Sequence, residues 1–292
     1  MKNYIYLNYG IKIDKIFVKG KEKYFFYNNT KYYIVENIKD INFVDNLFNL
    51  TNRLYYNNLT INTFILNNEN KYLTNKDGNN ICILKVNNME SNYTLDYINK
   101  FENFNCNLDD YDIVNEWKKT VDNLEKEMIE YNKEFPIIQN SINYFIGMAE
   151  NAISLLNNYK KEIINNNNSI GHKIKLTNTN LDNPFNFIKT NRMYDLSNYI
   201  QYKFYTNKND YDEIEKMIKS IRNEYEAIFL FSNLLFPKFY FDMVVDILNN
   251  IVNEEKLNVF INNIKNYKEL LIYIQNRLKN VKEIQLISWI SE

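Results

Sequence analysis

Residues 11–54 read IKIDKIFVKGKEKYFFYNNTKYYIVENIKDINFVDNLFNLTNRL. Apolar and polar residues alternate through the first part of this stretch, and two short polar turns interrupt it. A two-residue period with many aromatic and β-branched side chains is typical of strands. We therefore predict strands at residues 12–18, 23–27 and 31–35. From Asp40 onward the apolar side chains recur every three or four residues instead, which predicts a helix that Asp40 caps.

The strand pattern returns after this helix. Residues 60–66 and 80–86 are apolar and β-prone. The dipeptide Asp77-Gly78 lies between them and is a strong hairpin signal, because both residue types tolerate the positive φ that tight hairpin turns need. The first part of the chain is therefore predicted to hold three strands, one helix and then two strands.

Nearly everything after Tyr111 is predicted to be helical. The apolar spacing predicts helices at residues 113–131, 137–159, 194–205, 211–236, 239–252, 254–264 and 267–281. Residues 165–192 show little periodicity and are predicted to be irregular.

This element order divides the chain into three parts. We predict a β-rich N-lobe with one helix at residues 1–90, a linker or hinge at 91–112 and a helical C-lobe at 113–292. A small sheet lobe followed by a larger helical lobe is the layout of kinase-like phosphotransferases. The predicted fold class is therefore α+β, a bilobal protein-kinase-like fold, although element order alone does not establish function.

Composition and charge exclude several classes of protein. The 292 residues include 35 basic and 36 acidic ones, well mixed along the chain. Nucleic-acid binders gather basic residues on one face, so no nucleic-acid partner is expected. The chain shows neither a signal peptide nor an uncharged apolar window of about 18 residues, so no membrane contact and a cytoplasmic location are predicted.

The cysteines indicate neither a metal nor a cofactor. Cys82 and Cys106 form no CxxC pair and no Cys/His cluster, so no zinc site is predicted. They could form one disulfide, but two buried thiols in a reducing compartment are the simpler interpretation.

Three segments of the helical half resemble a known family. They are DIVNEWKKTVDNLE at residues 112–125, YFIGMAENAI at 144–153, and residues 171–201, which begin GHKI and end YDLSNYIQ. In this order and spacing they resemble the YutH-type spore-coat proteins. That family is related to the CotS-type coat proteins and, more distantly, to the choline and aminoglycoside kinases. The block GMAENA at 147–152 is the most specific part.

The resemblance covers roughly residues 110–205. It implies a kinase-like fold and an association with spore formation, with other spore-coat components as partners and the cytoplasm or the spore coat as the location. It does not imply catalysis, because relatives in this group are themselves degenerate.

Phosphoryl transfer needs a lysine for the phosphates, an aspartate for the acceptor hydroxyl, and an acid and an amide for magnesium. In the related small-molecule kinases the aspartate and the amide belong to a motif that begins His-Gly-Asp. The matching run here begins at His172, with Ile174 at the aspartate position and Thr179 at the amide position. Family spacing places the second metal-binding acid near Thr190, and residues 187–192 contain no carboxylate.

These substitutions lead to the interpretation of a degenerate site without catalytic residues or a metal. His172, Ile174 and Thr179 are then the relic of a catalytic loop, and Thr190 is the relic of a metal site. An isoleucine cannot accept a proton or align a hydroxyl.

Other positions at which kinases carry functional residues are interpreted as lost or structural as well. The third strand has no central lysine, since Lys31 lies at its edge, and no Gly-rich phosphate loop is present. Asp195 is expected to cap its helix or pair with a nearby base. Glu150 is expected to be buried with a partner such as Arg192.

Three hypotheses about function remain open. The first is a kinase-like protein without phosphotransfer, and so not an enzyme, that serves as a structural or binding component of the spore coat. The second is an active small-molecule phosphotransferase of the aminoglycoside or choline type, which would use displaced residues such as Asp182, Asp195 or Asn178. The third is a nucleotide- or metabolite-binding sensor.

Overall fold

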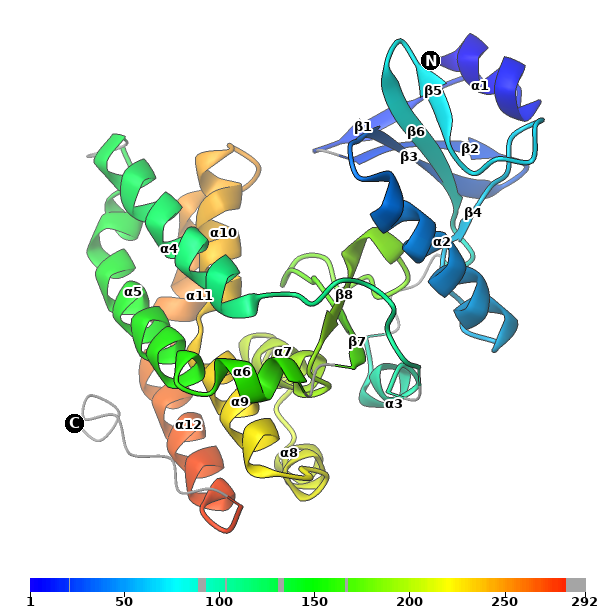
Figure 1. Ribbon diagram of the computed structural model, residues 1–292. Helices are drawn as coiled ribbons and strands as arrows, with labels where there is room; N and C mark the ends of the chain where they lie inside the picture. The colour runs from blue at the N-terminus through cyan, green and yellow to red at the C-terminus, as the bar shows by residue number, and fades with distance from the viewer. Residues whose placement is uncertain (21, 89–92, 103, 131–133, 166–167, 282–292) are drawn as a thin grey trace. The chain divides into compact units, whose positions relative to one another are not determined.

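The computed structural model describes the chain except for residues 21, 89–92, 103, 131–133, 166–167 and 282–292. The chain forms two compact units (Figure 1). The first consists of Met1–Tyr93, Phe104–Asp109 and Thr179–Phe187, and the second of Thr94–Asn103, Asp110–Asn178 and Ile188–Glu292. The predicted hinge at 91–112 contributes residues to both units.

The first unit is built on one antiparallel sheet of six strands. The strands lie in the order β1 (Phe17–Lys19), β2 (Glu22–Tyr27), β3 (Thr30–Ile38), β6 (Asn79–Lys85) and β4 (Thr63–Phe64), and β5 (Thr74–Lys76) pairs with β6. The predicted hairpin turn is confirmed, with φ of 51° at Asp77 and 83° at Gly78. It joins β5 to β6, however, and not the predicted strand at 60–66, of which only β4 forms.

Two helices accompany the sheet, one more than predicted. α2 (Ile41–Tyr56) begins as expected, because the Asp40 carboxylate accepts a hydrogen bond from the Phe43 N–H at 2.9 Å. α1 (Lys2–Tyr9) is absent from the prediction because its Asn, Tyr and Ile residues are weak helix formers. Burial of two side chains four residues apart, Ile5 and Tyr9, holds it against the unit.

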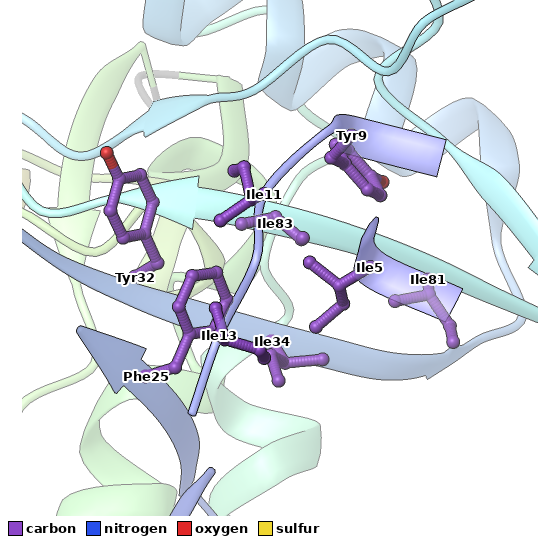
Figure 2. Packing of buried hydrophobic residues seen from close by; sticks show 9 residues of the cluster. All are labelled: Ile5, Tyr9, Ile11, Ile13, Phe25, Tyr32, Ile34, Ile81 and Ile83. Carbon is purple, nitrogen blue, oxygen red and sulfur yellow. The ribbon is translucent and has the colours of Figure 1, made fainter. Parts of the chain in front are cut away.

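The core of the first unit lies between the sheet and the N-terminal segment (Figure 2). Its members are Ile5, Tyr9, Ile11, Ile13, Phe25, Tyr32, Ile34, Ile81 and Ile83. The rings of Phe25 and Tyr32 stack with centroids 5.1 Å apart. Only the end of the predicted strand at 12–18 becomes a strand, yet the apolar residues before it are buried as the alternation predicts.

The second unit is mainly helical. Its α-helices are α3 (Leu95–Asn99), α4 (Ile113–Glu130), α5 (Pro136–Asn157), α6 (Lys160–Asn165), α7 (Met193–Tyr205), α8 (Tyr211–Lys219), α9 (Glu224–Leu235), α10 (Lys238–Leu248), α11 (Asn258–Ile261) and α12 (Ile264–Leu278). The described residues also form two 3₁₀ turns, η1 (Pro184–Asn186) in the first unit and η2 (Glu254–Leu257) in the second. The predicted helix at 211–236 is two helices, because Asn223 caps a new start by accepting a hydrogen bond from the Glu226 N–H at 3.0 Å.

A two-stranded sheet of β7 (Ser169–His172) and β8 (Phe187–Thr190) forms within the stretch that was predicted to be irregular. Each strand has only four residues, too few to show a period in the sequence. This sheet matters because it ends at His172 and Thr190, two of the predicted site residues.

Aromatic stacking fills the core of the helical unit. Trp117 of α4 stacks on Phe236 with centroids 4.4 Å apart, and Phe145 of α5 stacks on Tyr240 of α10 at 3.7 Å. The segment Glu224–Leu248 is apolar and long enough to cross a membrane by composition, but 83% of its most apolar window is buried within the protein. α9 and α10 therefore form the centre of this unit.

Two neighbouring phenylalanines on β2 test which residues form the core of the first unit. Phe25 is fully buried, whereas Phe26 is 46% exposed. Phe25→Ala is expected to lower the free energy of unfolding by about 3–5 kcal/mol through the lost burial and the cavity left behind. Phe26→Ala, the matched control, should lower it by less than about 1.5 kcal/mol. Urea unfolding measures both, and equal losses would contradict the core described here.

Candidate functional site

A buried histidine and a buried aspartate meet at the end of β7. His172 is the last residue of β7 and is fully buried, and Asp195 lies in the first turn of α7 with 4% exposure. The Asp195 carboxylate accepts a hydrogen bond from the His172 backbone N–H at 2.8 Å, and its other oxygen lies 2.5 Å from His172 Nδ1. One side chain thus fixes both the backbone and the ring of His172. The prediction that Asp195 pairs with a nearby base is confirmed.

The neighbours of this pair leave little space. The Phe101 ring meets the His172 imidazole edge to face, with centroids 4.5 Å apart. A Cβ atom added to Gly171 would lie 2.4 Å from Thr190 Cγ2 and 3.0 Å from Tyr194 Cδ1. Position 171 therefore accepts only glycine without rearrangement. Thr190, predicted as the relic of a metal site, is fully buried and supports this packing.

The loop after His172 is bordered by two carboxylates from α10. Lys175 Nζ lies 2.5 Å from the Asp246 carboxylate. Lys238 Nζ lies 2.7 Å from the Asp242 carboxylate and also donates to the backbone oxygen of Ile174. The Ile174 side chain is itself buried. Acidic groups are therefore present at this loop, although the residues next to His172 in the sequence supply none.

Lys173, the first residue after His172, places its amine over an aromatic ring. Its Nζ lies 4.5 Å from the centroid of the Tyr111 ring, and loss of water around the amine lowers the pKa of Lys173, an effect that the nearby Glu116 carboxylate opposes. Burial raises the pKa of the Tyr111 hydroxyl. The residue as a whole is still exposed, so the ammonium can reach an anion from solvent.

The remaining predicted residues of the loop have separate places. Asn178 exchanges backbone hydrogen bonds with Lys175, which closes the loop into a tight turn. Thr179 and Asp182 belong to the first unit, and Asp182 is buried there with 3% exposure. The backbone oxygen of Asp182 accepts a hydrogen bond from the Asn62 N–H at 2.8 Å.

The expectation for Glu150 is wrong. Glu150 is exposed, because the buried face of α5 is formed by neighbours such as Met148, Ala149 and Ala152. Arg192, its proposed partner, instead pairs with Glu226 at 2.8 Å.

Lys31 in the first unit lies at the start of β3, as predicted. Its Nζ lies 4.3 Å from the ring centroids of both Tyr24 and Tyr33 and donates a hydrogen bond to the Tyr33 hydroxyl at 2.8 Å. The centre of the strand holds Tyr33 and Val35.

Magnesium is the metal that nucleotide phosphotransfer commonly uses, and it requires several oxygen ligands in near-octahedral geometry. Across the described residues, no three His, Cys, Asp or Glu side chains gather as a metal site. Thr190 at the expected acid position is buried, and its Oγ1 has no hydrogen-bond partner within that part of the chain. The position expected to supply a metal-binding acid therefore supplies none here. Cys82 and Cys106 are buried and not bridged, as the simpler interpretation predicted.

The sheet unit, the helical unit and the His172 loop define a kinase-like protein. The aminoglycoside phosphotransferase of Alicyclobacillus acidocaldarius subsp. acidocaldarius matches with a TM-score of 0.61 and 9% identity, over 96% of this chain and 97% of that one. A spectinomycin phosphotransferase in complex with ADP and spectinomycin matches with a TM-score of 0.57 and 11% identity, over 94% and 95%. Its AMP-bound complex gives 0.57 and 12%, over 94% and 96%. These likenesses establish the predicted α+β kinase-like fold.

The chain belongs to the family described as "Spore coat putative kinase YutH", whose model matches residues 2–274. The resemblance found in residues 110–205 is therefore confirmed, and it extends through most of the chain. No match was found among the curated proteins.

The prediction that the chain is not an enzyme is contradicted. The family description reads "putative kinase", and the three solved structures above are phosphotransferases. The prediction rested on the residues around His172 and Thr190, on the third strand and on the missing Gly-rich loop. It did not consider the acids of α10, which lie beside the His172 loop although they are about seventy residues later in the chain. A signal was present: Lys238, Asp242 and Asp246 are spaced by four, which places them on one face of a helix.

Gly171 gives a direct test of the packing behind His172. Gly171→Ala is expected to destabilise the protein by about 1–3 kcal/mol, because Thr190 Cγ2 occupies the space that the new methyl group needs. Thr190→Ser removes that atom, so the double variant should recover part of the loss.

The matched control is Gly147→Ala on α5, where nothing lies within 4 Å of the added Cβ. This change should stabilise the protein by up to about 1 kcal/mol through helix propensity. Thermal and urea unfolding measure all four proteins, and a neutral Gly171→Ala would show that the contact with Thr190 is not tight.

Proposed function

We propose that this chain is a phosphotransferase that acts in the spore coat and holds its acceptor against the loop 173–175 and α10. The place of action follows the family description, and the kind of chemistry follows the family and the fold. The observation that carries the proposal is the position of two carboxylates, Asp242 and Asp246, beside the loop that follows His172.

A hydroxyl group that attacks phosphorus must lose its proton, and a carboxylate within hydrogen-bond reach can accept it. The Asp242 side chain is 30% exposed, whereas that of Asp246 is 9% exposed. Because its side chain is more exposed, we assign the role of proton acceptor to Asp242. In the reaction the acceptor oxygen bonds to the transferred phosphorus, the bond from that phosphorus to the leaving oxygen of the donor breaks, and Asp242 takes the proton.

Asp246 and the lysines have supporting roles. Asp246 holds the loop through Lys175, with 2.5 Å between the charged groups. Lys238 joins Asp242 to the backbone of Ile174, which orients the carboxylate toward the loop. Lys173, whose amine lies over the Tyr111 ring, is the side chain we assign to the anionic phosphoryl group. The acceptor class that suits this site is a small hydroxylated molecule.

The test is nucleotide turnover by the purified chain, with a panel of amino sugars and amino alcohols as acceptors. Asp242→Asn should lower kcat by roughly 100-fold or more, because it removes the proton acceptor. Lys173→Ala should mainly raise KM for the nucleotide. Glu125→Gln, an exposed change on α4, is the matched control and should leave both constants unchanged.

Two results would contradict the proposal. One is turnover that Asp242→Asn leaves intact. The other is a chain whose nucleotide turnover stays at the blank with every acceptor in the panel, although the protein is folded.

A further inference from the structure

A groove of about 940 Å³ opens on the second unit among residues of α3, α7 and α8. Its lining is strongly charged, with the basic residues Arg192, Lys203, Lys216 and Arg222 and the acidic residues Asp96, Glu102 and Glu213. Ligand sites in proteins commonly enclose roughly 300–1,000 Å³, so this groove is large enough for a metabolite. The proposed phosphoryl transfer uses none of these side chains.

A buried arginine forms the fixed part of the groove. The Arg192 side chain is only 5% exposed, and its Nε and one terminal nitrogen both donate to the Glu226 carboxylate at 2.8 Å. A second terminal nitrogen donates to Glu102 at 3.2 Å, and the guanidinium also donates to the backbone oxygen of Ser220. These contacts hold together the start of α7, the C-cap of α8, the start of α9 and Glu102. The groove is therefore built by a structured ion-pair network.

The other basic side chains of the groove lining form longer ion pairs or none among the described residues. Lys203 pairs with Glu213 at 3.3 Å. Arg222 reaches Glu102 only at 3.9 Å, and its side chain is 67% exposed. Lys216 is exposed, and none of the ion pairs found among the described residues includes it. Lys216 and Arg222 are thus the two cations of the lining that a ligand can engage without breaking a close ion pair.

The groove is also connected to the histidine loop. Glu102 follows Phe101 in the chain, and the Phe101 ring packs on the His172 imidazole. Arg192 immediately precedes α7 and lies less than one helical turn before Asp195, which holds the backbone and ring of His172. A ligand that draws Arg222 away from Glu102 therefore acts on residues adjacent to both supports of His172.

We propose that this groove is a second binding site, that it takes a phosphorylated small molecule through Lys216 and Arg222, and that its occupancy is transmitted to His172. Phosphate is the group that fits, because it carries more than one charge and accepts hydrogen bonds from an arginine and a lysine together. The proposal does not depend on phosphoryl transfer at the loop.

The test uses pyrophosphate as the probe and exploits the single histidine of the chain. In protein labelled with ¹⁵N-histidine, the imidazole signals in an NMR spectrum come from His172 alone. Pyrophosphate should shift these signals, and calorimetry of the same samples should show binding. The double variant Lys216→Ala/Arg222→Ala should weaken that binding at least tenfold and abolish the shift at the same pyrophosphate concentration.

Two control variants locate the site. Lys219→Ala changes another exposed lysine of α8 outside the groove lining and should alter the affinity less than twofold. In a Lys173→Ala background, which removes the cation assigned to phosphoryl binding at the loop, pyrophosphate should still bind and Lys216→Ala/Arg222→Ala should still weaken that binding. The proposal is overturned if pyrophosphate does not bind, if Lys173→Ala weakens binding more than the double variant does, or if binding leaves the His172 signals unmoved.

Discussion

The Asp195 carboxylate accepts a hydrogen bond from the backbone of His172 and lies 2.5 Å from its ring, and the loop 173–175 begins at this contact. Both residues are buried, so an unpaired carboxylate here would be strongly destabilising. Its contacts with the backbone N–H and the imidazole of His172 offset that cost. The same contact joins β7 to α7, and it fixes where the chain enters the loop that continues with Lys173 and Ile174.

The helix that carries Asp195 is itself held by buried polar contacts. Ser197 Oγ contacts the Asn233 side chain, and Gln201 donates to the backbone oxygen of Asn233 at 2.8 Å, so α7 is bonded to α9 along its length. Arg192 fixes its start through Glu226. Partly satisfied networks of this kind are costly, whereas satisfied ones specify one arrangement. The loop and the groove therefore both border α7, and the coupling that we propose between the groove and His172 runs through this helix.

Much of the fold is predictable from the sequence, and the site is only partly so. The strand alternation at residues 23–27 and 31–35, the Asp40 cap and the hairpin at 77–78 are local signals, and each is confirmed. α1, β7 and β8 are missed because they are short and depend on tertiary burial. The pairing of Asp195 was foreseen from its place at a helix start. The carboxylates of α10 could not be connected to the loop, because only folding brings them to Lys175 and Ile174. The inference that the chain is not an enzyme is contradicted by the family description and by the phosphotransferases that share the fold.

Native-state hydrogen exchange at the His172 amide tests the central contact most directly. The account predicts that this amide exchanges as slowly as the amides in the middle of α7, because its bond to Asp195 opens only when the second unit unfolds. Exchange as fast as that of an exposed loop residue such as Thr177 would contradict it, since the histidine loop would then be held by something other than the Asp195 carboxylate.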